Sequence, residues 1–234
     1  MSFTLRSALL GSALFGVALL STQAAATEFS FLSGNPAPET FGNNYAQTLG
    51  GLTTTATAWS TTGHDGQFQT AELEIYGGAG MGACNRNEGS NCSINNNMHA
   101  LDNKDGEDLI LFRFSSSVRL TSLTLLQVSK DSDLSLWAGT GSQSLANLKP
   151  TNLGFETFAN SAIWANEIKT VDLSNFAGTY DWLAVSARLA QKDDFALLRT
   201  LNVQAVTTPV PEADNWTMLL AGLGLVGFAV RRRA

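Results

Sequence analysis

Alternation of apolar and polar residues runs through the middle of this chain and constrains its fold more than any other feature. Residues 52–60 (LTTTATAWS), 67–78 (QFQTAELEIYGG) and 132–140 (SDLSLWAGT) are clear cases. Residues 108–114 place Ile110, Phe112 and Phe114 on one face of an extended chain and Leu109, Leu111 and Arg113 on the other. Because successive side chains of a strand point to opposite faces, a period of two predicts β-strands.

Further segments of the same kind follow at 118–128, 163–174, 180–190 and 194–206. In the last of them Phe195, Leu197, Leu201, Val203 and Ala205 are expected to share a face that Arg199 interrupts. Roughly nine or ten short strands with turn-like gaps predict an all-β domain, an antiparallel β-sandwich or jelly roll, with an up-and-down barrel as the alternative. Residues 35–51 are expected to be an irregular start, the glycine-rich residues 78–83 (GAGMGA) a turn, and residues 141–162 the least strand-like part.

The N-terminus has the pattern of a secretory signal helix. Arg6 is followed by an apolar run (ALLGSALFGVALL) and by the small residues of TQAAAT, chiefly the alanines at 24–26. Such a pattern predicts a signal peptide over residues 1–26, with cleavage after Ala26 or after Ala24, and therefore export by the Sec machinery and cutting by signal peptidase. The alternative is an uncleaved anchor.

The C-terminus has a second apolar segment that ends in a basic cluster. Residues 207–215 are a linker containing Pro211 and Glu212, and residues 216–234 are expected to form a single transmembrane helix closed by Arg231, Arg232 and Arg233. The uncharged part, Trp216–Val230, gives only about 22 Å of helix against a hydrocarbon core of about 30 Å. Arginines belong on the cytoplasmic side, which places the domain of residues 27–206 outside.

Val210, Pro211 and Glu212, the short helix and the arginines together resemble the PEP-CTERM sorting signal of Gram-negative bacteria. The resemblance covers about 25 residues, and Ala213 stands where many members carry a second proline. It implies a membrane enzyme, exosortase, as the partner that processes the protein near Pro-Glu. It also implies that the protein is held at the inner membrane before it reaches the cell surface. A plain tail anchor is the alternative.

The folded domain is acidic and has two cysteines. The whole chain has a net charge of −6, and four of its 14 basic residues but only two of its 20 acids lie in the two ends. This surface disfavours nucleic acid as a partner. Export places Cys84 and Cys92 in an oxidising compartment, which predicts a disulfide across a short loop.

Residues 77–108 are rich in glycine, asparagine and acids, as expected of a functional or solvated loop. Ca²⁺ prefers oxygen ligands, and it is the only cofactor that this composition suggests. The candidate ligands are Asn87, Glu88, Asp102, Asp105, Asp131 and Asp133, provided that the loops carrying them share one end of the domain. The alternative is a solvated loop in which the Asn and Asp side chains accept hydrogen bonds from the backbone of their own turns.

TATAWSTTG, NRNEGS, HALDN, DLILFRFSSSVRLTSLTL and DSDLSLWAG occur in that order. As a set they resemble a family of exosortase-dependent surface proteins, which implies location and a β-rich domain but no catalytic activity. We therefore expect a non-catalytic protein of the cell surface or extracellular matrix with exopolysaccharide as a partner. A Ca²⁺-dependent carbohydrate-binding module is the alternative, and a secreted hydrolase is less favoured because the sequence contains no nucleophile motif.

Overall fold

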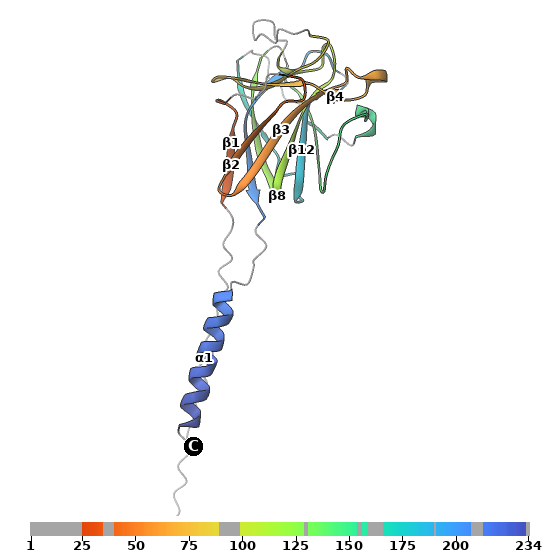
Figure 1. Cartoon of the computed structure of the whole chain (residues 1–234). Helices are drawn as coiled ribbons and strands as arrows, with labels where there is room; N and C mark the ends of the chain where they lie inside the picture. Colours follow the sequence, from red (N-terminus) through yellow and green to blue (C-terminus); the bar gives the residue numbers. More distant parts are fainter. Residues whose placement is uncertain are drawn as a thin grey trace, which may run out of the picture.

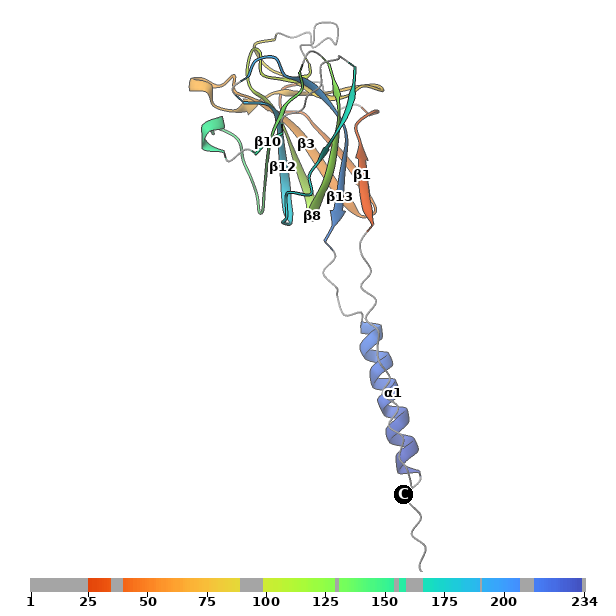
Figure 2. The ribbon, with the colours of Figure 1, turned by 180° about the vertical axis from the view of Figure 1, so that it is seen from behind.

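The computed structural model describes residues 25–34, 40–88, 99–128, 131–153, 156–158, 166–189, 191–206 and 213–232. Antiparallel strands form nearly all of it, and one helix follows at the C-terminus (Figures 1 and 2). The strands are β1 (Ala26–Ser30), β2 (Asn44–Leu49), β3 (Leu52–Ser60), β4 (Gln69–Thr70), β5 (Glu72–Tyr76), β6 (Gly80–Cys84), β7 (Leu101–Asp102), β8 (Asp108–Gln127), β9 (Leu134–Gly139), β10 (Glu156–Phe158), β11 (Ile168–Asp172), β12 (Tyr180–Ala187) and β13 (Phe195–Ala205). Two short 3₁₀ turns, His64–Gly66 and Pro150–Asn152, and the helix α1 (Ala213–Arg231) complete the described elements.

Strand β8 organises the sheet because its two halves pair with different neighbours. Its first half lies between β3 and β12, and its second half lies between β13 and β11. The three serines of residues 115–117 mark the change, and Val118 pairs with both the first residue of β12 and the last residue of β13. The prediction of an all-β antiparallel fold is confirmed. The finer prediction of a sandwich or jelly roll is not, since the pairings join all 13 strands into one continuous sheet.

Alternation along β8 divides the apolar residues into two clusters. Ile110, Phe112 and Phe114 lie in the main core, where the ring of Phe112 stacks on that of Phe31 with centroids 5.3 Å apart. Leu109 and Leu111 point to the other face and pack with Trp182 and Phe68 in a second cluster. The predicted division of this segment into two faces is therefore confirmed.

The second cluster depends on a glycine next to a tryptophan. Trp137 and Trp182 meet edge to face with ring centroids 4.4 Å apart. A Cβ at Gly139 would overlap the Trp182 ring, so the strand can pass the ring only without a side chain.

One predicted face was wrong, and a bulge is the reason. The register of β13 against β8 shifts between Leu198 and Thr200. Ala196, Leu198, Leu201 and Val203 therefore belong to the main core, whereas Leu197 does not. Because the extra residue at Arg199 reverses the alternation, Phe195 and Leu197 do not share a face with Leu201.

Two segments expected to be irregular are strands. Residues 44–49 form β2, which pairs with β3 along its whole length. Residues 80–84 form β6, which pairs with β5 and contacts β13. Glycine is needed here for close packing: a Cβ at Gly82 would overlap the carbonyl oxygen of His99, and one at Gly80 would lie 2.7 Å from that of Leu198. The turn lies earlier, at residues 77–79.

The start of the domain and its exit into the tail lie side by side. Strand β1 is antiparallel to β13, with Ala26 opposite Gln204. Ala26 is thus already a strand residue, whereas residues 1–24 of the predicted signal peptide lie outside the described residues. Figure 2 shows β1 and β13 together at the end of the domain that faces the helix.

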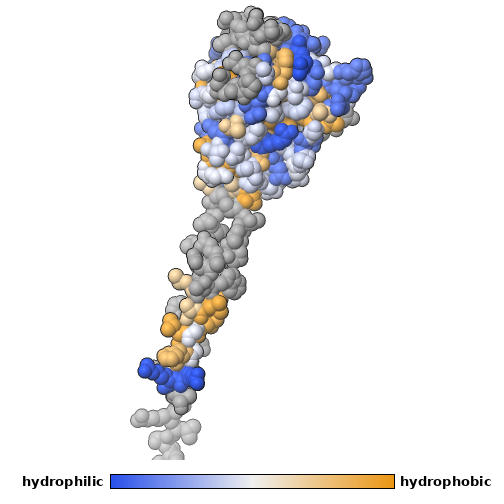
Figure 3. All heavy atoms as spheres, in the orientation of Figure 1, coloured by the Kyte–Doolittle hydropathy of each residue, from blue (hydrophilic) through white to orange (hydrophobic). Residues whose placement is uncertain are grey.

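The C-terminal segment is helical, as predicted, but the prediction of a membrane span is not confirmed. Within the described part of the chain, no helix has both the length and the apolar character needed to cross a membrane. The apolar part of α1 is short, and three glycines interrupt its second half. Its side chains are nevertheless open to solvent: Met218, Leu219, Leu220, Leu223, Leu225, Val226, Phe228 and Val230 are all at least half exposed, and Figure 3 shows this apolar surface with a hydrophilic end.

Candidate functional site

Two groups of carboxylates lie at the end of the domain opposite the tail. The first acidic cluster is Glu88, Asp102 and Asp108, and one carboxylate oxygen from each lies within 4.8 Å of the others. The second acidic cluster is Asp131, Asp133 and Asp194, which meet the same limit. The two clusters are neighbours: Asp102 pairs with Phe195 across β7 and β13, and the side chain of Asn103 donates to Asp194.

A tight turn after β6 positions Glu88. The backbone N–H of Asn87 donates to the side-chain oxygen of Asn85 at 2.9 Å, as in an Asx turn, and the N–H of Glu88 donates to the Asn85 carbonyl. The N–H of Asn85 in turn donates to Glu88 Oε2 at 2.8 Å. The turn thus directs the Glu88 carboxylate back toward the sheet.

The other two members of the first acidic cluster are held in the same way, each by one N–H donor. Asp102 Oδ1 accepts the backbone N–H of Lys104 at 2.9 Å, and Asp108 Oδ1 accepts the side-chain amide of Asn85 at 3.2 Å. Asp108 Oδ2 is buried and has no hydrogen-bond partner. Each carboxylate is therefore oriented by an N–H donor on one oxygen, and the Ser60 hydroxyl also acts on Asp108 and lowers its pKa against the effect of burial.

Burial of three acids together has a clear electrostatic effect. Loss of solvent, helped by the neighbouring carboxylates and opposed by the charge of Lys104, raises the pKa of Glu88 to about 8 and that of Asp102 to about 7. The pKa of Asp108 lies well above its usual range, because the side chain is buried and because Asp102 and Glu88 face it. The protein itself provides too little stabilisation for three negative charges at this point.

The second acidic cluster differs because the protein supplies its cation. Arg188 Nη1 lies 2.8 Å from Asp133 Oδ2. Asp194 Oδ1 accepts the N–H of Asp133 at 2.8 Å. Burial and the charges of Asp131 and Asp133 still raise the pKa of Asp194 to about 7, and burial raises that of Asp131.

The expected calcium ligands are thus partly brought together. Glu88 and Asp102 meet in one cluster, Asp131 and Asp133 meet in the other, and the loops do share one end of the domain. Asp105 is exposed and belongs to neither group, and the Asn87 amide donates to its carbonyl at 2.8 Å. Two members, Asp108 and Asp194, were absent from the predicted set. The available signal was an acid directly before or at the start of an apolar strand, where aspartate is disfavoured.

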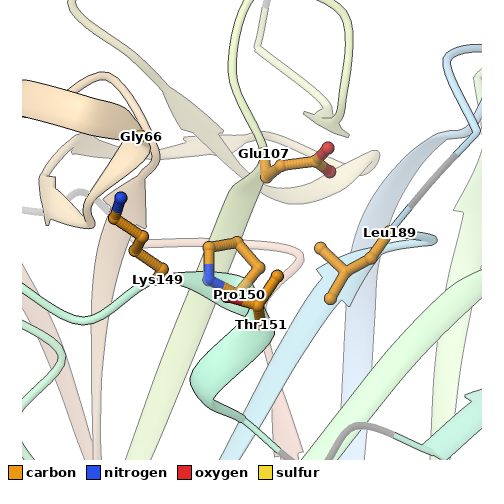
Figure 4. A pocket seen from close by; sticks show the side chains of 6 residues that line it. All are labelled: Gly66, Glu107, Lys149, Pro150, Thr151 and Leu189. Atoms are coloured by element: carbon orange, nitrogen blue, oxygen red, sulfur yellow. The ribbon is translucent and has the colours of Figure 1, made fainter.

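A shallow pocket of about 410 Å³ has Glu107, the residue before Asp108, in its lining (Figure 4). Glu107 reaches into it, and burial raises the pKa of that carboxyl to about 7. Its other lining residues are Gly66, Lys149, Pro150, Thr151 and Leu189. None of these described lining residues is aromatic, so none of them offers a flat ring on which a sugar could stack.

Cys84 ends strand β6, next to the turn that carries Glu88. It is fully buried, and no free cysteine occurs among the described residues. Its predicted partner, Cys92, lies outside the described residues, so the bond between the two stays a prediction.

An acidic β-domain followed by a Pro-Glu pair, an apolar helix and terminal arginines is the organisation of a protein with a C-terminal sorting tail. Residues 207–233 match the PEP-CTERM protein-sorting motif. The chain thus carries this motif, as the resemblance implied. Among curated proteins, none matches the chain. Val210, Pro211, Glu212 and Arg233 fall within the matched segment but outside the described residues.

Proposed function

We propose that this is an exported, non-catalytic cell-surface protein that exosortase sorts through its C-terminal tail. The observation that carries the proposal is the match of residues 207–233 to the PEP-CTERM protein-sorting motif. Signal peptidase and the Sec machinery act first, exosortase then acts near Pro211-Glu212, and the acidic domain is delivered to the surface or matrix. At the surface or in the matrix, exopolysaccharide is its proposed partner.

The surface of α1 supports a temporary hold at the inner membrane. The helix has 19 residues, and its described side chains from Met218 to Val230 are apolar on all sides. Helices of this kind are stable in lipid or inside a protein but not in water. Arg231 and Arg232 at its end match the cytoplasmic side of a membrane.

The test compares the full chain in a host with exosortase and in the same host without it. We expect the recovered external protein to lack both ends by intact mass, and we expect unprocessed chain to accumulate in the inner-membrane fraction when exosortase is absent. In the host with exosortase, the Pro211→Ala, Glu212→Ala variant should accumulate unprocessed, as the wild type does in the host without exosortase. Thr207→Ala, Thr208→Ala in the same linker is the matched control and should be processed normally.

Two results would contradict the proposal. One is full chain that fractionates as a soluble cytoplasmic protein in the host with exosortase. The other is external protein that retains residues 211–234. The non-catalytic part is tested separately: turnover of glycans or esters by the external protein would make it an enzyme.

A further inference from the structure

We infer that the first acidic cluster, Glu88, Asp102 and Asp108, is a binding site for one divalent cation, and that the cation is Ca²⁺. This site is independent of the sorting tail and goes beyond the proposed function. It joins the turn after β6, strand β7 and the start of β8, three segments that approach one another only at this end of the sheet.

The first argument is the contrast between the two clusters. Both collect three acids within the same distance, yet only the second has an arginine in contact. Among the described residues, no lysine, arginine or histidine forms an ion pair with Glu88, Asp102 or Asp108. Residues 89–98, which follow Glu88, include no basic residue in their sequence. Among the described residues, the second acidic cluster thus has a cation in contact with one of its carboxylates. The first has the charge of Lys104, which lowers the pKa of Glu88 and Asp102 but forms no ion pair with them.

The second argument is an oxygen that points to a ligand and does not depend on counting acids. Asp108 has no exposed surface, and one of its carboxylate oxygens lies within 4.8 Å of those of Glu88 and Asp102. Its Oδ2 accepts no well-formed hydrogen bond, although the Ser60 hydroxyl, on the residue opposite it across β3 and β8, is near enough to lower its pKa. The backbone of Asp108 is fixed as well, since its carbonyl accepts the Ser186 hydroxyl at 2.8 Å. A buried acceptor without a donor destabilises a fold unless a cation or water satisfies it.

A third observation lies next to it. The side-chain amide of Asn103 donates to the Arg188 carbonyl at 2.7 Å, while its Oδ1 is buried and has no partner. An unsatisfied acceptor thus occurs on the residue that follows Asp102, at the same end of the domain.

The chemistry of the donors selects the metal. All three side chains offer carboxylate oxygens, which suit hard cations and disfavour Zn²⁺ or Cu²⁺. Mg²⁺ keeps most of its water and requires regular octahedral geometry, whereas Ca²⁺ accepts several carboxylates in an irregular arrangement. A site with three nearly buried carboxylates therefore favours Ca²⁺. Extracellular calcium modules typically bind with dissociation constants of about 0.1–1 mM.

The test uses the full chain, kept whole in a host without exosortase, purified in non-ionic detergent and stripped with EDTA. Calorimetric titration with CaCl₂ should show one bound ion per chain with a dissociation constant at or below about 1 mM. MgCl₂ should bind at least tenfold more weakly. No heat and no rise in melting temperature at 10 mM CaCl₂ would overturn the inference.

Variants locate the site. Asp108→Asn should weaken calcium binding at least tenfold and abolish the calcium-dependent rise in melting temperature. Asp194→Asn is the matched control: it removes an equally buried acid of the second acidic cluster and should bind calcium as the wild type does. Equal losses in both variants would overturn the assignment of the ion to the first acidic cluster.

Folding of the variants gives an independent readout. Because Asp108→Asn removes a buried charge, it should melt at the same temperature as the wild type or higher in EDTA, and lower than the wild type in calcium. If that variant fails to fold, Glu88→Gln at the rim of the site, where the side chain is 8% exposed, takes its place with the same expected loss of binding. Unchanged calcium binding in the folded variant would contradict the inference.

Discussion

Replacement of Arg188 by glutamine tests whether the arginine serves as the cation of the second acidic cluster. Its guanidinium lies 2.8 Å from Asp133, whose side chain is only 5% exposed, while the arginine side chain is 34% exposed. The backbone of Arg188 is held separately, because its N–H donates to the Asp133 carbonyl at 3.0 Å and its carbonyl accepts from Asn103. The substitution therefore removes a charge and leaves the local fold in place.

The size of the effect follows from this intermediate exposure. Removal of one partner from a fully buried pair costs about 3–5 kcal/mol, because the other charge is left in a poor solvent. Removal of an exposed pair costs about 0–1 kcal/mol. With the carboxylate buried and the arginine one-third exposed, we expect Arg188→Gln to lower the free energy of unfolding by about 2 kcal/mol. For a domain of this size, that lowers the melting temperature by about 4–8 °C.

The assay is denaturant unfolding of the full chain in detergent with EDTA, followed by tryptophan fluorescence, since Trp137 and Trp182 pack in the second apolar cluster. The double variant Arg188→Gln, Asp133→Asn should recover most of the loss, because the stranded charge is gone. Calcium should also stabilise Arg188→Gln more than the wild type, since a second cluster then lacks its cation. A loss below about 0.5 kcal/mol, or losses that simply add in the double variant, would refute the reasoning.

Three further predictions concern the core, the strand that carries the site, and pH. Leu123→Ala, in the main core, should lower the free energy of unfolding by about 2–5 kcal/mol in denaturant titrations, while Ile168→Ala, at an apolar side chain that is already exposed, should change it by less than about 0.5 kcal/mol. Gly82→Ala should prevent normal folding because the added Cβ meets the His99 carbonyl, whereas Gly77→Ala, which has open space, should fold as the wild type does; equal circular dichroism spectra for the two would contradict this. Burial holds the pKa of Asp194 at about 7, so in EDTA the folded state carries a proton that the unfolded state has lost, and stability should fall as pH rises from about 4 to 7. Melting temperatures of Asp194→Asn across that range should fall less steeply, and a slope equal to that of the wild type would exclude this cause.

The strands with strict alternation were predictable because their pattern is local. Residues 52–60 coincide with β3, and the two faces of β8 follow directly from the order of its apolar residues. In such segments the alternation already determines which side chains lie on the buried face, whatever the partner strand is. The helical C-terminus was predictable for the same reason.

Strand β6 was not predictable because its Gly82 is required by a contact with the backbone of His99, which the sequence alone does not show. GMGAC has the composition of a turn, and Gly82 is required only because the His99 backbone passes over it. The bulge at Arg199 is another case, since a single extra residue reversed the expected face of Phe195 and Leu197. The glycine at position 82 and the bulge at Arg199 each depend on a neighbouring segment that is distant in sequence.

The site shows the same limit. The density of acids in residues 77–108 indicated oxygen ligands, and Glu88 and Asp102 were identified on that basis. The sequence could not show that Asp108 turns inward beside them, or that Arg188, far along the chain, forms an ion pair with Asp133 while no described cation forms one with the first acidic cluster. Composition therefore predicted the chemistry of this end of the domain, and the topology decided which acids meet.

The topology also separates the two proposed activities in space. Strand β13 has 11 residues and is therefore about 35 Å long; Asp194 precedes its first residue and the tail follows its last. Strand β1 begins beside the exit, at Ala26 opposite Gln204. The two proposed cuts therefore fall at the end of the domain remote from the acids. It follows that Asp108→Asn should be exported and processed at the wild-type rate, while Pro211→Ala, Glu212→Ala should bind calcium with wild-type affinity. Slower export or processing of Asp108→Asn, or weaker calcium binding by Pro211→Ala, Glu212→Ala, would mean that the two ends are coupled and that calcium binding takes part in sorting.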